Sequence, residues 1–235
     1  MKIDKLIYKI KRRWMKLCLQ PIRVFCFHQV SNTFDASTMY LSDWTQIDQF
    51  KSNILRLKEQ YELISLEKAI QKLKHDIYRT KKYAVLTADD GWASLKNILP
   101  WLAEQQIPIT LFVNPAYLRG EETRENGMNE LLKWDELNVI LSQYPNISIA
   151  SHGWNHTLCI DMPDEEFEKN VVRSHNFLRQ YDQYIPFFAY PCGRFRNSQN
   201  AILRRKGMTP VYMDGEKNFN DNTMVHRELL DGQNL

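Results

Sequence analysis

The sequence predicts an α/β fold in which a mainly parallel sheet or barrel carries its helices on the outside. Short apolar segments rich in strand-forming residues alternate with longer segments whose apolar residues recur at helical spacing, through most of the 235 residues. This alternation is typical of parallel strands joined by crossover helices. The composition, with 43% hydrophobic and 25% charged residues, supplies enough apolar side chains for one sizeable core.

The predicted strands are short apolar runs, most of which end at a turn or a polar residue. They span residues 22–27, 61–65, 82–88, 107–113, 147–150, 187–190 and 210–213. The first follows Pro21, and the third ends at Asp89-Asp90-Gly91. Between the strands, polar stretches at residues 29–43 and 114–127 are expected to be loops.

The predicted helices span residues 44–60, 66–74, 93–105, 129–142, 163–181 and 197–206. One helix face of 44–60 carries Trp44, Ile47, Phe50, Ile54 and Leu57. Ser65 is a suitable N-cap for 66–74, and Pro100 is expected to bend 93–105. Acidic residues follow Pro163 at the start of 163–181, and Gly207 ends the last helix.

Residues 1–20 are predicted to form a basic amphipathic helix ahead of a single domain at 21–235. Apolar residues recur there at helical spacing: Ile3, Leu6, Ile7, Ile10, Trp14 and Leu17, with lysines and arginines in much of the rest. Such a helix lies either on an anionic membrane surface or against the domain with its basic face in solvent. Charges interrupt every apolar run, so neither a secretory signal nor a membrane span is expected. The expected location is therefore cytoplasmic, with any membrane contact peripheral at the inner face.

Charge, glycine content and cysteine spacing exclude several classes of protein. The formal net charge of +3 gives no nucleic-acid signature, and the 8 glycines form no phosphate-binding motif. The four cysteines, Cys18, Cys26, Cys159 and Cys192, form no C-x-x-C pair. A thiolate zinc site or a thioredoxin-type centre is therefore not expected, and a reducing compartment is favoured.

Side chains capable of catalysis or metal binding follow several predicted strands. They are His28, Asp89, Asp90, His152 and Cys192. Strand ends converge on one face of a parallel barrel, where active sites are built. His152 and His156 are four residues apart, so on a helical turn both imidazoles would face one ion. Alone this pair is a weak signal, and Asp-Asp-Gly alone is a common turn. Together, two histidines and a carboxylate form a facial ligand set, and the second aspartate stays available to accept a proton.

Four segments carry a family resemblance. Thr87-Ala88-Asp89-Asp90-Gly91 resembles the T-F-D-D-G motif of polysaccharide deacetylases, the NodB-homology family of carbohydrate esterases (family 4). Residues 151–156 resemble the family's H-[S/T]-x-x-H motif, and residues 188–193 resemble the motif ending in P-[Y/F]-G. Residues 25–30 resemble the Y-H-x-V opening of the branch related to poly-N-acetylglucosamine deacetylases. The resemblance covers most of the chain and implies a distorted (β/α) barrel.

The resemblance also implies a role for each matching residue. Asp90, His152 and His156 would bind a divalent metal: zinc, or alternatively cobalt, nickel or iron. Asp89 would be the general base, and a backbone N–H near Cys192 would help to hold the oxyanion. His28 would protonate the leaving amine, replacing an acid that other members carry near the C-terminus. His226 is an alternative acid.

Some positions leave alternatives open. Ala189 stands where many family members have an arginine that contacts the catalytic aspartate, which puts the tuning of Asp89 in question. Trp92 and Trp154 flank the expected ligands and either stack on a sugar or pack beside the site. Arg194 or Arg196 either contacts a phosphate-bearing substrate or belongs to a solvated face.

The main interpretation is an N-deacetylase of an N-acetylated sugar in a glycan or glycan precursor. A lipid-linked saccharide intermediate in cell-surface glycan assembly would suit the basic N-terminal helix. One alternative is a catalytically inactive glycan-binding relative of the fold, suggested by the absent arginine and by the altered third motif, in which Cys192 replaces Tyr or Phe. Another is a metal hydrolase of a different amide.

Overall fold

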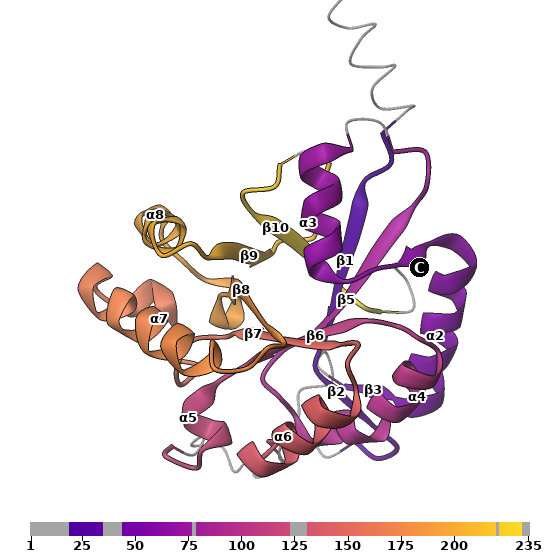
Figure 1. Ribbon diagram of the computed structural model, residues 1–235, viewed down its shortest axis with the longest axis horizontal. Helices are drawn as coiled ribbons and strands as arrows, with labels where there is room; N and C mark the ends of the chain where they lie inside the picture. Colours follow the sequence, from indigo (N-terminus) through magenta and orange to yellow (C-terminus); the bar gives the residue numbers. More distant parts are fainter. Residues whose placement is uncertain (1–18, 35–43, 77–78, 123–130, 220, 232–235) are drawn as a thin grey trace, which may run out of the picture.

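The computed structural model describes residues 19–34, 44–76, 79–122, 131–219 and 221–231 (Figure 1). The predicted helix over residues 1–20 lies almost entirely outside these residues and stays a prediction. Among the described helices, none combines the length and the apolar character that crossing a membrane requires.

Parallel strands close into a seven-stranded barrel at the centre of the molecule. These strands are β1 (Ile22–Phe27), β5 (Tyr83–Ala88), β6 (Ile109–Val113), β7 (Ile147–Ser151), β8 (Tyr184–Ala189), β9 (Thr209–Met213) and β10 (Val225–Leu229). The hydrogen-bonded order is β1-β10-β9-β8-β7-β6-β5, and β1 pairs with β5 along its whole length to close the ring. The short β4 (Glu62–Leu63) adds to β5. The predicted barrel of parallel strands is thus confirmed, with the C-terminal strand ends on one rim.

Helices surround the barrel (Figure 1). They are α2 (Ile47–Gln60), α3 (Leu66–His75), α4 (Leu99–Glu104), α5 (Pro115–Leu118), α6 (Trp134–Gln143), α7 (Asp164–Leu178) and α8 (Asn197–Arg205). Shorter 3-10 turns are η2 (Ala93–Asn97), η3 (Cys159–Asp161) and η4 (Pro191–Gly193). The apolar face predicted for α2 packs inward, since Phe50, Ile54 and Leu57 are fully buried. Every residue of β5 is buried, because the barrel interior covers one face and the helices cover the other.

The structure differs from the sequence prediction in several elements. A two-stranded parallel sheet, β2 (Gln29–Ser31) with β3 (Trp44–Gln46), replaces the predicted loop start and first helical turn. The helix expected over 93–105 is divided into η2 and α4, with Pro100 in the first turn of α4. Strand β10 was not predicted, because His226, Arg227 and Glu228 give it no apolar pattern. Two of these charges are matched inside the fold: Arg227 pairs with Asp89, and Glu228 pairs with Arg23.

Candidate active site

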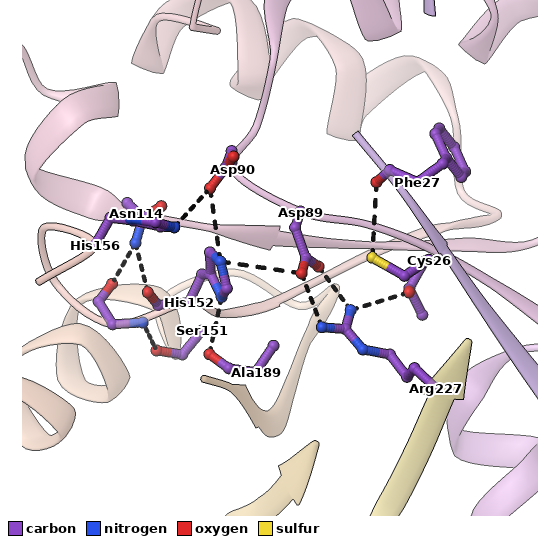
Figure 2. Close-up of polar contacts among 12 residues, drawn as sticks. Cys26, Phe27, Asp89, Asp90, Asn114, Ser151, His152, His156, Ala189 and Arg227 are labelled. Atoms are coloured by element: carbon purple, nitrogen blue, oxygen red, sulfur yellow. Dashed lines mark hydrogen bonds and ion pairs between the residues drawn. The ribbon is translucent and has the colours of Figure 1, made fainter. Parts of the chain in front are cut away.

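Two aspartates and two histidines meet at the C-terminal rim of the barrel (Figure 2). Asp89 and Asp90 follow β5, while His152 and His156 follow β7. Oδ1 of Asp90 lies 3.2 Å from Nε2 of His156 and 3.6 Å from Nε2 of His152. Ligand atoms bound to one tetrahedral zinc ion are about 3.4 Å apart. The three donors therefore fit a divalent metal.

The His152 imidazole is oriented and kept neutral by its surroundings. Its Nδ1 lies 2.8 Å from the backbone carbonyl of Ala189. A carbonyl only accepts, so Nδ1 carries the hydrogen and Nε2 presents its lone pair toward Asp90. Burial lowers the pKa of His152, against the opposing pull of the carboxylates of Asp89 and Asp90. A neutral imidazole is the form that binds a metal.

The segment from His152 to His156 is an irregular loop, so the predicted helical turn is wrong. Gly153 has φ +81° and His156 has φ +58°, both in the left-handed region. A Cβ at Gly153 would lie 3.2 Å from Oδ1 of Asn170, so the hydroxyl residue that the family carries here would be strained by the positive φ and tightly packed against Asn170. The buried Asn114 amide donates to the carbonyls of His152 and Gly153 and holds the loop.

Several residues of the candidate site have a left-handed backbone conformation. Among the described residues, four non-glycine residues have positive φ: Asp90, Gln106, His156 and Cys192. Three of these belong to the candidate site, where the surrounding structure supports the conformational cost. The sequence does not show which of these residues have positive φ, because non-glycine residues mostly adopt negative φ, whereas glycine adopts positive φ readily.

Asp89 is held by an arginine that the sequence analysis missed. Arg227 of β10 donates to both carboxylate oxygens of Asp89, at 2.7 and 2.8 Å, and to Oγ1 of Thr87 at 3.1 Å (Figure 2). Its side chain is buried, with the guanidinium 5.0 Å from the centre of the Phe112 ring. Arg227 thus makes the contact to Asp89 that was expected from an arginine at position 189.

The charge of Asp89 is fixed by this pair. Burial alone would favour the neutral acid, but Arg227, together with His152 and His28, outweighs burial and holds the pKa of Asp89 well below its usual range. Oδ2 of Asp89 lies 4.0 Å from Nε2 of His152. An ionised carboxylate therefore stands beside the metal-binding set.

His28 is brought to the same place by β1. One ligand atom from each of His28, Cys26 and Asp89 lies within 4.8 Å of the others. The imidazole is half-buried, and its Nδ1 is buried without a hydrogen-bond partner among the described residues. Burial raises the pKa of the Cys26 thiol well above its ordinary value, so Cys26 stays protonated. Arg227 already forms hydrogen bonds with both carboxylate oxygens of Asp89, so this second cluster is a poor cation site. The His28 imidazole lies near Asp89, with its Nδ1 not hydrogen-bonded to any described residue.

Both tryptophans are buried, which favours packing beside the site, one of the two alternatives, over stacking on a sugar. Trp92 is 3% exposed and Trp154 is 5% exposed. The Trp92 indole N–H donates to Oδ2 of Asp90 at 3.1 Å, which leaves Oδ1 facing the histidines. The Trp154 ring lies beneath the guanidinium of Arg173, 3.7 Å from the ring centre. Both rings support the ligand residues by packing.

The remaining predicted residues are distributed as follows. The His226 side chain points to the opposite face of β10 from Arg227, and its Nδ1 is hydrogen-bonded to Oδ2 of Asp214 at 2.7 Å. It therefore points away from Asp89, which corrects the prediction that His226 is an alternative acid. Arg196 is engaged by Asp164 and by backbone carbonyls, which makes it structural. Arg194 is exposed next to η4, and its substrate contact stays a prediction. Cys192 is exposed on η4.

Replacing Trp92 with Phe is expected to weaken metal binding by about 10- to 100-fold, because the hydrogen bond that orients Asp90 is lost. The measurement is competition for Zn²⁺ with a chromophoric chelator. Trp101→Phe is the matched control, since Trp101 is half-buried on α4. Equal affinities in Trp92→Phe and the unmodified protein would contradict the orienting role.

Comparisons with known proteins agree with this geometry. The profile of the polysaccharide deacetylase family matches residues 76–211, more than half of the chain. The fold is similar to that of IcaB from Ammonifex degensii, with a TM-score of 0.77 and 19% identity over 91% of this chain and 93% of the other. It is also similar to the Streptococcus pyogenes deacetylase PplD, with a TM-score of 0.76 and 19% identity over 90% and 92% of the chains. A de-N-acetylase from Aggregatibacter actinomycetemcomitans gives a TM-score of 0.74 and 19% identity over 90% and 95%. No curated protein matches the chain in sequence.

Proposed function

This chain belongs to the polysaccharide deacetylase family and is a carbohydrate deacetylase, and we propose that it hydrolyses the N-acetyl group of a sugar with the help of a divalent metal. One observation carries the proposal. An ionised, arginine-bound carboxylate, Asp89, lies 4.0 Å from a histidine of a three-residue metal-binding set. This arrangement pairs a proton acceptor with an electrophilic centre, as hydrolysis of an unactivated amide requires.

Metal binding, proton acceptance and stabilisation of the oxyanion are proposed for different residues of the site. Asp90, His152 and His156 would hold the metal, which when bound polarises the acetamide carbonyl and makes water more acidic. Asp89 accepts a proton from the water that attacks the carbonyl carbon, using lone pairs not engaged by Arg227. The N–H of Cys192 is proposed to stabilise the negative charge that develops on the carbonyl oxygen.

The second half of the reaction breaks the C–N bond. The departing nitrogen takes a proton from His28, because an amine anion is too basic to leave unprotonated. The products are acetate and the free amine of the sugar. Asp89 then releases its proton to solvent and His28 takes one up, which restores both residues to their starting states. No covalent bond to the protein is formed, which agrees with the burial and protonation of Cys26.

The alternative of an inactive glycan-binding relative was motivated by the missing arginine at position 189 and by the altered third motif. Arg227 makes the same contact to Asp89 from another strand, so the first of these two grounds disappears. The binding-only interpretation stays an outcome of the experiment rather than a second proposal.

The experiment is acetate release by protein loaded in turn with Zn²⁺, Co²⁺, Ni²⁺ or Fe²⁺. The panel contains N-acetylglucosamine oligosaccharides, O-acetylated sugars and N-acetylated peptides, with chelator-treated protein as the control. Metal-dependent acetate release from the N-acetylated saccharides alone is expected. Release from peptides only, or no release from any substrate by metal-loaded protein, would overturn the proposal.

His28→Gln should separate the acid step from the base step. Loss of the proton donor is expected to lower kcat on an N-acetylated saccharide by about 10²- to 10⁴-fold. Hydrolysis of p-nitrophenyl acetate should fall far less, because p-nitrophenolate leaves without a proton. The comparison of both substrates by initial rates checks the role. An equal loss on both substrates would assign His28 to something other than protonation.

We also propose that the substrate is lipid-linked, with the reaction at the inner face of a membrane. The support is the basic amphipathic pattern of residues 1–18, which lie outside the described residues. Acetate release from a lipid-linked saccharide in anionic vesicles, compared with the same saccharide in solution, tests this. Efficient turnover of the soluble saccharide only would overturn the proposal.

A further inference from the structure

Two aromatic side chains form a pair at the small sheet that follows His28: Trp44 begins β3, and Phe34 lies three residues after the end of β2. Phe34 is 39% exposed, and its ring centre lies 5.5 Å from that of the half-buried Trp44, with the ring planes inclined by 54°. Single exposed apolar residues are ordinary on protein surfaces. Two neighbouring aromatic rings, one of them exposed, are a larger apolar contact area than a single exposed ring.

Hydrogen bonds fix this pair in place. The Trp44 indole N–H donates to Oγ of Ser31 at 2.8 Å, and the Ser31 hydroxyl donates to the carbonyl of Thr33 at 2.7 Å. The indole is therefore oriented by the same turn that carries Phe34. A ring held in one orientation loses little conformational entropy when a ligand stacks on it.

Strand pairing and hydrogen bonds connect the pair to two segments of the active site. β2 begins directly after His28, and Trp44 pairs with Gln29, so Trp44 lies one strand spacing, about 4.8 Å, from the residue next to His28. β2 is also bonded to the segment that follows Asp89 and Asp90, through Ser94 to the N–H of Val30 and Asn97 to its carbonyl. Phe34 itself is six residues beyond His28. The pair thus lies on segments that directly follow His28 and contact the chain after Asp90, at the same rim of the barrel as the reacting group.

The chemistry around the pair suits a sugar. Asn32 and Thr33 are exposed next to Phe34 and offer an amide and a hydroxyl beside an apolar face. A pyranose ring presents an apolar C–H face bordered by hydroxyl groups, and aromatic rings with a few polar neighbours are what such a ligand requires. A membrane surface would instead be met by apolar and basic side chains.

We propose that Phe34 and Trp44 form a saccharide subsite that binds the unit adjacent to the one being deacetylated. The proposal rests on the proposed deacetylase function. Its consequence is that the enzyme acts on an oligosaccharide or polymer in preference to a single N-acetylated sugar.

Phe34→Ala is the primary variant, because an exposed side chain can be removed without disturbing the core. Phe219→Ala is the matched control. Phe219 is 42% exposed, and its neighbour Asn218 pairs with Ile22 at the start of β1, which places it at the opposite end of the barrel. Trp44→Leu provides a second variant of the pair.

For Phe34→Ala we expect KM for a β-linked N-acetylglucosamine tetrasaccharide to rise about tenfold, with kcat preserved and with no change for N-acetylglucosamine itself. Phe219→Ala should match the unmodified protein on both substrates. An unchanged KM for the tetrasaccharide, or an equal change for the monosaccharide, would overturn the subsite.

Calorimetric titration with the fully deacetylated tetrasaccharide makes the test independent of catalysis. Binding by the unmodified protein that weakens about tenfold in Phe34→Ala supports the subsite even if no acetate is released, an outcome that would count against the deacetylase proposal alone. No binding by the unmodified protein overturns the subsite. Weaker binding of Phe34→Ala to anionic phospholipid vesicles, with saccharide binding unchanged, would reassign the pair to a membrane and also overturn it.

Discussion

Asp89→Asn is expected to lower kcat for acetate release by at least 10²- to 10⁴-fold, with a small effect on KM. The amide keeps the shape of the side chain but cannot accept a proton from water. Initial rates with a saturating N-acetylated oligosaccharide check this. Residual activity within a factor of ten of the unmodified protein would show that another group is the base.

The loss of activity in Asp89→Asn must be separated from a loss of fold. Arg227 is buried and its charge is paired with Asp89. Removing one partner of such a pair costs roughly 3–5 kcal/mol, whereas removing both charges is often close to neutral. The double variant Asp89→Asn, Arg227→Met is therefore expected to melt closer to the unmodified protein than Asp89→Asn does, while remaining inactive. Thermal melts followed by circular dichroism measure this.

Arg227→Met is expected to destabilise the fold by roughly 3–5 kcal/mol near neutral pH, because it leaves the Asp89 carboxylate buried without its counter-charge. Activity should fall as well, since the carboxylate loses the two hydrogen bonds that aim it. Arg227→Lys should recover part of the stability through its charge. It should not restore the bidentate geometry, so recovery of activity should lag behind recovery of stability. Urea unfolding and kcat measured on the same preparations test both statements.

The pH dependence of stability supplies the control for this pair. The pKa of Asp89 is lowered in the folded protein, so the pair contributes its full stability above the ordinary aspartate pKa near 4. That contribution is lost as pH falls through the lowered folded-state pKa. In Arg227→Met, burial without the guanidinium raises the pKa of Asp89. Acidification should therefore reduce the stability difference between the two proteins. The variant gains stability as pH falls through its raised Asp89 pKa, and the unmodified protein loses stability below pH of about 4. A difference independent of pH would indicate that Arg227 acts by packing alone.

Local sequence patterns were sufficient for most of the parallel strands and of the catalytic rim, while the choice of a barrel over an open sheet came from the family resemblance. Hydrophobic periodicity is read over a few residues, and it located β1, β5, β6, β7 and β8 to within a few residues. The residues that end these strands were therefore predicted to meet at one rim, and Asp89, Asp90, His152 and His28 do meet there. The periodicity failed for β10, because a strand whose inward side chain is an arginine has no apolar pattern to detect.

Strand ends and motif order are local properties, so the residue types that reach the rim could be predicted from the sequence. Which of these groups pair with one another depends on how the barrel closes, and this became known from the fold. Arg227 is 138 residues from Asp89 and reaches it only because β10 lies between β9 and β1. The same closure turns His226 outward and buries Trp92 and Trp154, and positive φ at Asp90 and His156 directs the metal-binding donors to one point. These outcomes depend on long-range burial and electrostatics, which no window of the sequence contains.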